Sequence, residues 1–133
     1  MFSKRIRTSV AALIGCLVLV AVQASDPFQG AWQGTWEGAG SSGRFNLTLT
    51  KSGDAWGGKV DVGQDTGDYT ATLANASFEG SKFKARYEYT PDPQAEIVLE
   101  STFTGSDATG TWSMVQKGGN ESFASGSWTV SKK

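Results

Sequence analysis

Carboxylates are the side chains in this sequence whose spacing could support catalysis. Asp65-Thr66-Gly67 matches the tripeptide of aspartic proteases, in which two aspartates share a proton. Gln64 and Gly63 precede it where a protease would carry apolar strand residues. We therefore interpret the tripeptide as part of a solvated loop.

Two other carboxylate groups have spacings that a metal ion or a sugar could use. Asp61, Asp65 and Asp68 could offer oxygen ligands to calcium, but they lack the spacing of an EF-hand loop. Glu96 and Glu100 lie four residues apart, and paired carboxylates are the minimum for glycoside hydrolysis. We interpret both groups as surface charge, and we predict no metal site and no catalytic residue.

The residue types that most hydrolases need are missing. The chain has no histidine, and its only cysteine is Cys16. This composition excludes a histidine general base, a Cys/His zinc site and a Ser-His-Asp triad. We predict that the protein is not an enzyme and that it requires no cofactor.

The first 24 residues have the composition of a secretory signal peptide. Lys4, Arg5 and Arg7 precede an apolar run from 10 to 22, and small residues place the cleavage site at Ala24. The run is too short for a membrane-spanning helix. We expect an exported protein, periplasmic or extracellular, with no membrane span after cleavage.

A lipid anchor is the alternative fate of this N-terminal segment. Leu13-Ile14-Gly15-Cys16 resembles a bacterial lipobox, in which the cysteine becomes lipidated. Residues 17–22 continue the apolar run, however, where a lipoprotein normally has a polar tether. Lipidation at Cys16 is therefore the minor alternative, and an uncleaved anchor is another.

Residues 25–133 have the length of one domain. Without Lys4, Arg5 and Arg7, nine basic residues stand against 13 acidic ones, a net charge of −4. No basic run remains, so we expect no nucleic-acid partner. The sequence does not determine the oligomeric state.

Alternating apolar and polar residues predict an all-β domain. Residues 82–89 are the clearest case, with four apolar residues on one face and four charged residues on the other. Short connections favour an eight-stranded antiparallel up-and-down β-barrel, and a two-sheet β-sandwich is the alternative. The expected strands are 31–37, 44–51, 55–62, 69–73, 82–89, 96–104, 109–115 and 122–131.

A Gly-x-Trp signature occurs near both ends of this run of strands. It reads Gly34-Thr35-Trp36, Gly110-Thr111-Trp112 and Gly126-Ser127-Trp128. We expect the first and last strands to pair and close the sheet, because closure removes exposed edges.

The inward face is rich in aromatic residues, and a small eight-stranded barrel is either filled by side chains or holds one small ligand. One hypothesis is a binding barrel for a small apolar or aromatic molecule, oriented by indole N–H or phenol O–H groups. The other is an envelope-associated or secreted interaction module with a solid core. The candidate ligand-binding residues are Trp36, Tyr87, Tyr89, Trp112 and Trp128.

Two resemblances support the barrel. The segment 34–42 is similar to the opening strand of avidin-type proteins, and lipocalins also open on Gly-x-Trp; both families enclose a ligand. Gly38 stands where an avidin has a ligand-contacting asparagine, so biotin binding is not implied.

Residues 30–131 more closely resemble small exported bacterial domains of unassigned function. The motifs that carry this likeness are Phe45-Asn46-Leu47-Thr48-Leu49, Trp56-Gly57-Gly58-Lys59-Val60 and Phe103-Thr104-Gly105 with Gly110-Thr111-Trp112.

Overall fold

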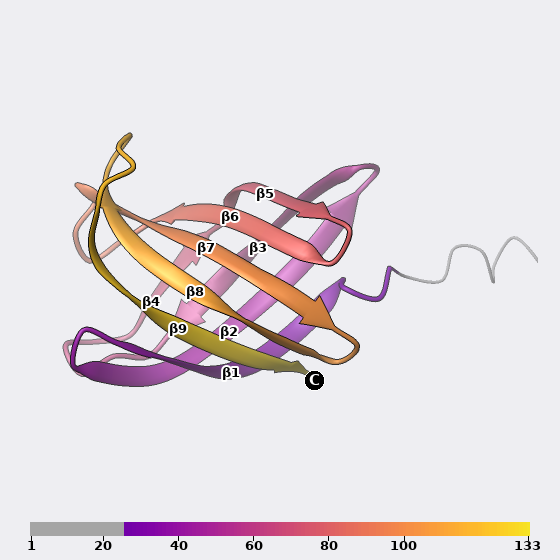
Figure 1. The fold of residues 1–133 in the computed structure, drawn as a ribbon, viewed down its shortest axis with the longest axis horizontal. Coiled ribbons are helices and arrows are strands. Elements are labelled where there is room, and N and C mark those ends of the chain that lie inside the picture. Colours follow the sequence, from indigo (N-terminus) through magenta and orange to yellow (C-terminus); the bar gives the residue numbers. More distant parts are fainter. Residues whose placement is uncertain (1–25) are drawn as a thin grey trace, which may run out of the picture.

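The computed structural model describes residues 26–133, which form one antiparallel sheet of nine strands and no helix (Figure 1). Within this range, no helix is long and apolar enough to cross a membrane. The predicted signal peptide and Cys16 lie outside the described residues. The strands are β1 (Gly30–Gly38), β2 (Ser41–Ser52), β3 (Ala55–Val62), β4 (Tyr69–Thr72), β5 (Ala74–Glu79), β6 (Lys82–Glu88), β7 (Ala95–Thr104), β8 (Asp107–Gln116) and β9 (Ser122–Lys132).

Pairing between the first and last strands turns the sheet into a nearly closed barrel. The strand order is β4-β3-β2-β1-β9-β8-β7-β6-β5, so β1 lies between β2 and β9. Trp36 of β1 lies opposite Trp128 of β9. The predicted all-β class, the barrel form and the pairing of the terminal Gly-x-Trp strands are therefore confirmed.

The predicted number of eight strands was wrong, because β5 was not expected. Only Ala76 and Phe78 of β5 pack against the core, and two inward residues are too few to show an alternation. The backbone is also irregular here, since Asn75 has a φ of 53° and the register shifts between Ala74 and Ser77. Such a bulge breaks the period of two that predicts a strand.

β4 and β5 follow each other with only Leu73 between them, and they pair with different neighbours. β4 pairs with β3, whereas β5 pairs with β6. The N–H of Leu73 donates to the carbonyl of Gly58 at 2.9 Å, which extends the contact with β3 by one bond. Residues 69–79 thus act as one interrupted strand that changes partner halfway.

This change of partner leaves a seam between β4 and β6, where the described sheet has no strand ladder. Side chains connect the two sides instead. The hydroxyls of Tyr69 and Tyr87 lie 2.9 Å apart, and Thr90 Oγ1 donates to the carbonyl of Thr70 at 3.1 Å. We call this region the seam below.

The expected division between inner and outer faces is confirmed. On β2, Phe45, Leu47 and Leu49 are buried, as the alternation predicts. In the described range 26–133, no polar or charged residue is buried. The interior is therefore lined by apolar and aromatic side chains.

One end of this interior is filled by six aromatic side chains, which we call the aromatic plug. Its rings are in contact, from Phe28 stacked on Phe78 at 4.6 Å to Phe83 and Phe103 at 5.6 Å between centroids. Stacked and edge-to-face packing of aromatic rings adds to the hydrophobic stabilisation. The plug consists of Phe28, Trp32, Trp56, Phe78, Phe83 and Phe103.

Candidate functional site: an aromatic cavity

The other end of the barrel contains a cavity of about 280 Å³. This volume lies just below the range of about 300–1,000 Å³ that is typical of sites for drug-sized molecules, so the cavity suits a smaller molecule. Every strand except β5 contributes at least one side chain to the lining. The structure brings together all five residues that the sequence singled out, namely Trp36, Tyr87, Tyr89, Trp112 and Trp128.

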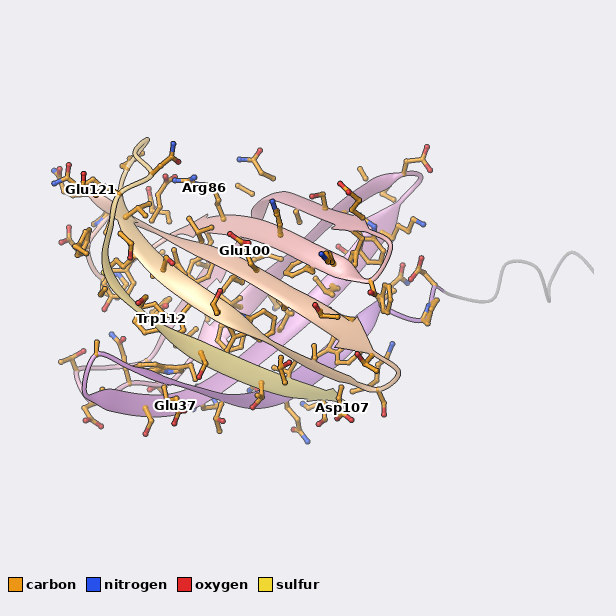
Figure 2. The ribbon with its side chains drawn as sticks, in the orientation of Figure 1. Glu37, Arg86, Glu100, Asp107, Trp112 and Glu121 are labelled. Atoms are coloured by element: carbon orange, nitrogen blue, oxygen red, sulfur yellow. The ribbon has the colours of Figure 1, made fainter. Side chains whose placement is uncertain are left out.

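Figure 2 labels Trp112, which lines the cavity, together with Glu37 and Glu100, whose side chains are exposed. Trp112 of β8 is buried, whereas Glu100 on the neighbouring strand β7 and Glu37 on β1 are exposed. The cavity reaches the end of the barrel at Ala39 in the β1–β2 turn and Gln64 in the β3–β4 loop.

The indole N–H groups at the cavity are already bonded, which differs from the expectation that they would orient a ligand. Each donates to a backbone carbonyl of another strand or loop, and Trp112 of β8 reaches across β9 to β1. The tryptophans therefore offer the cavity their ring surfaces. The bonds are Trp36 Nε1 to Gly63 O (2.9 Å), Trp112 Nε1 to Glu37 O (3.0 Å) and Trp128 Nε1 to Thr111 O (2.9 Å).

Glycines on the adjacent strands make room for two of these bonds. Gly126 lies opposite Trp112, and a Cβ there would be 2.0 Å from Glu37 O and 2.7 Å from Trp112 Nε1. Gly43 lies opposite Trp36, and a Cβ there would be 2.9 Å from Trp36 Nε1. Close backbone approach is a recognised use of glycine in strands.

Three tyrosines and one glutamine supply most of the polar atoms of the cavity. Tyr69 and Tyr87 share a hydrogen bond across the seam at 2.9 Å. The side-chain amide of Gln64 lies 3.0 Å from the Tyr89 hydroxyl through Nε2 and 3.3 Å through Oε1. The rings of Tyr69 and Tyr89 meet edge to face at 5.1 Å.

Burial keeps the two seam tyrosines protonated. It raises the pKa of Tyr69 from its ordinary value to about 12, and it also raises the pKa of Tyr87 well above its ordinary value. The cause is the cost of placing a phenolate in an apolar environment. Both groups therefore stay protonated at neutral pH and into the alkaline range, and one of their two hydrogens is used in the bond that they share.

Sequence reasoning missed Gln64 and Tyr69 as site residues. Tyr69 carries a usable signal, because it shares an inward face with Ala71 and Leu73 in a predicted strand. Gln64 carries no such signal, because it lies in a loop, where the period of two no longer predicts the direction of a side chain.

The cavity is uncharged. Among the described residues, its lining includes no aspartate, glutamate, lysine or arginine. Apart from the tyrosines, its polar side chains are Gln64 and Ser41. A site of this composition favours binding of neutral molecules.

The carboxylates considered for calcium do not line the cavity. Arg44 pairs with Asp61 at 2.9 Å and with Asp68 at 3.4 Å, and Asp65 is exposed. Within residues 26–133, no group of three or more His, Cys, Asp or Glu side chains could hold a metal ion. Arg44 supplies the positive charge beside Asp61 and Asp68.

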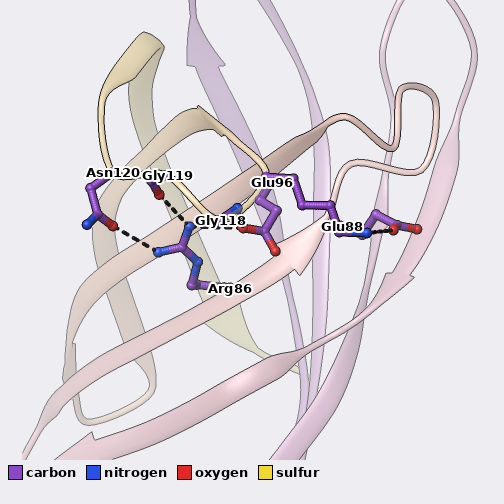
Figure 3. Close-up of polar contacts among 7 residues, drawn as sticks. Arg86, Glu88, Glu96, Gly118, Gly119 and Asn120 are labelled. Carbon is purple, nitrogen blue, oxygen red and sulfur yellow. Dashed lines mark hydrogen bonds and ion pairs between the residues drawn. The ribbon is translucent and has the colours of Figure 1, made fainter.

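Glu96 belongs to a network that holds the β8–β9 loop (Figure 3). Its Oε1 accepts from Arg86 at 3.0 Å and from the Gly118 N–H at 3.1 Å. Arg86 also donates to the carbonyl of Gly119 at 2.9 Å. The Gly118 bond, followed by the Arg86 bond and charge, lowers the pKa of Glu96. Glu100 is exposed and takes no part in this network.

The residues at the cavity come from almost the whole length of the domain, so the site depends on closure of the barrel. Its chemistry consists of aromatic surfaces and a few neutral hydrogen-bonding groups. No protein-family model matches this chain, and no curated protein sequence matches it.

Proposed function

We propose that this chain is an exported β-barrel that binds a small apolar or aromatic molecule in the cavity and performs no catalysis. The observation that carries the proposal is the cavity of about 280 Å³, lined by aromatic rings with a few convergent polar groups. Ligand sites commonly combine these features. Trp36, Tyr87, Tyr89, Trp112 and Trp128 are proposed as the binding residues.

The arrangement of the rings supports an aromatic ligand. Trp36 and Trp112 meet edge to face with centroids 5.8 Å apart, and the Phe45 and Trp128 rings are 5.1 Å apart. Such walls present both ring faces and ring edges. A planar ring can therefore pack against them in the edge-to-face geometry that aromatic pairs prefer.

Export remains part of the proposal and rests on residues 1–24. Their basic start, apolar run and small residues before Ser25 have the pattern of a cleaved signal peptide. The resemblance to small exported bacterial domains agrees with a periplasmic or extracellular location. The mass of the purified chain tests this point, because cleavage after Ala24 would leave Ser25 as the first residue.

Filling the cavity tests the proposed function. Ala124 lines the cavity and is partly buried, so Ala124→Phe should occupy the space that a ligand would use. We expect saturating toluene to raise the unfolding temperature of the unmodified chain by mass action. Toluene should also shift the indole N–H signals of the cavity tryptophans, and Ala124→Phe should abolish both effects.

Ala74→Phe is the matched control for this substitution. Ala74 is exposed on the outer side of the barrel and does not line the cavity, so toluene binding should persist in this variant. If toluene has no effect on the unmodified chain, the binding proposal is wrong. The interaction module acting through its surface would then be the better account.

A further inference from the structure

We propose that the ligand is a neutral ring compound carrying a hydrogen-bond acceptor, which receives a hydrogen bond from the hydroxyl pair of Tyr69 and Tyr87. This inference rests on the proposed function and specifies the chemical class of the ligand. It follows from the charges, the hydrogen bonds and the position of the seam, taken in turn below.

The absence of charge in the lining selects a neutral ligand. No lysine, arginine or histidine lines the cavity, so no described side chain there would pair with a carboxylate or phosphate. No aspartate or glutamate lines it either, so an ammonium group would also be unpaired. Burying an unpaired charge costs far more than an apolar contact returns.

The hydroxyl pair has one donor more than its own bond uses. Tyr69 and Tyr87 carry one O–H each, and their single shared bond at 2.9 Å takes one of these hydrogens. The hydrogen bonds among residues 26–133 include no acceptor for the other. Either oxygen can be the donor of the shared bond, so the second hydrogen lies on Tyr69 or on Tyr87, and both residues line the cavity. An acceptor on a molecule in the cavity would satisfy this hydrogen.

Apart from Ser41, which lies at the start of β2 and away from the seam strands β4 and β6, the other polar groups of the cavity are already bonded. The Tyr89 hydroxyl is engaged with Gln64, whose Nε2 also donates to Thr66 Oγ1 at 3.1 Å. The three indole N–H groups are bonded to backbone carbonyls. A ligand acceptor therefore meets an unused donor at the seam, between Tyr69 on β4 and Tyr87 on β6.

Four probes of one shape test this inference on the full chain. Acetophenone carries a carbonyl acceptor, ethylbenzene has none, benzoate is an anion and benzylammonium is a cation. By calorimetry or indole N–H shifts, we expect acetophenone to bind about three- to tenfold more tightly than ethylbenzene, the value of one hydrogen bond. The two ions should bind at least tenfold more weakly than acetophenone.

Tyrosine variants locate the donor. Tyr69→Phe or Tyr87→Phe alone should keep the preference for acetophenone, because the remaining hydroxyl retains its own hydrogen. The double variant should lose the preference while still binding ethylbenzene. Trp56→Phe, in the aromatic plug at the far end, is the control and should behave as the unmodified chain.

The outcomes separate this inference from the proposed function. If ethylbenzene binds as tightly as acetophenone, or benzoate binds as tightly as either, the inference is overturned and the cavity remains a site for rings. If the double variant keeps the preference, the donor is not the hydroxyl pair. If none of the four probes binds, both the inference and the proposed function are wrong.

Discussion

At the scale of single residues, the Gly-x-Trp signature has a structural role that the sequence does not reveal. Alternation predicted that Trp36, Trp112 and Trp128 face inward, and all three line the cavity. Their hydrogen bonds could not be predicted, because each acceptor lies on a different strand or loop. Gly126 is conspicuous in the sequence, but its contact with Glu37 depends on the closed barrel.

Gly126→Ala should destabilise the domain more than a typical surface substitution. Its Cβ would lie 2.0 Å from Glu37 O, so the Trp112 bond to that carbonyl must lengthen or break. We expect the free energy of unfolding, measured in urea, to fall by about 2–4 kcal/mol. Gly57→Ala is the control, because its Cβ would meet only Thr50 Oγ1, at 3.8 Å. Equal stability of both variants would contradict this role of Gly126.

The buried tyrosines predict a loss of stability at alkaline pH. Tyrosines in the unfolded chain ionise near pH 10, whereas Tyr69 in the folded chain ionises at about 12. Between these values the folded state retains protons that the unfolded state releases, so rising pH favours unfolding. The contribution is fully present below about pH 10 and is lost as the pH rises through about 12.

Urea midpoints measured across this alkaline range, with tyrosinate absorbance, test the tyrosine prediction. The Tyr69→Phe/Tyr87→Phe variant should show a shallower decline than the unmodified chain, because it lacks both groups. An identical decline in the two proteins would show that other groups cause the alkaline unfolding.

At the scale of elements, the sequence predicts a strand well where the alternation is long. β2 and β6 follow the expected faces, since their apolar residues recur at every second position. β5 was missed because the irregular backbone at Asn75 interrupts a short alternation. The change of partner at Leu73, which creates the seam, arises from pairing between distant segments and has no local signal.

The β8–β9 loop should depend on the carboxylate of Glu96. Glu96→Gln removes the charge that accepts from Arg86 and from the Gly118 N–H, so Gly118 should exchange its amide hydrogen faster. The loss of stability should be about 1 kcal/mol, typical of a hydrogen bond at a partly exposed site. Glu100→Gln, exposed on the same strand, should leave this exchange unchanged.

Acid should loosen the β8–β9 loop as Glu96→Gln does, because it also removes the charge of Glu96. Because the pKa of Glu96 is lowered in the folded protein, its stabilisation is present above the unfolded pKa of about 4.5 and is lost as the pH falls further. Two results would contradict the network. One is equal protection of the Gly118 amide in the unmodified chain and in Glu96→Gln, and the other is equal protection at neutral and at acidic pH.

At the scale of the whole molecule, aromatic side chains pack the interior at one end of the barrel, and the cavity lies at the other. Phe28, Trp56 and Phe78 of the packed end also help to line an open groove of about 450 Å³. The sequence predicted an aromatic interior but left a solid core and a cavity both open, because periodicity gives the direction of a side chain and not the space around it. Six aromatic residues form the plug, whereas tryptophans and tyrosines line the cavity. This division gives the small domain both a packed aromatic cluster and a cavity.

Native mass spectrometry of the full chain, expressed with export in a bacterial host, tests the central claim most directly. The account predicts one small molecule per chain, either carried from the host or taken up from added acetophenone. The adduct should disappear on denaturation and be missing from the Ala124→Phe variant. A bare mass both before and after addition of acetophenone would contradict the claim that this barrel is a binding protein.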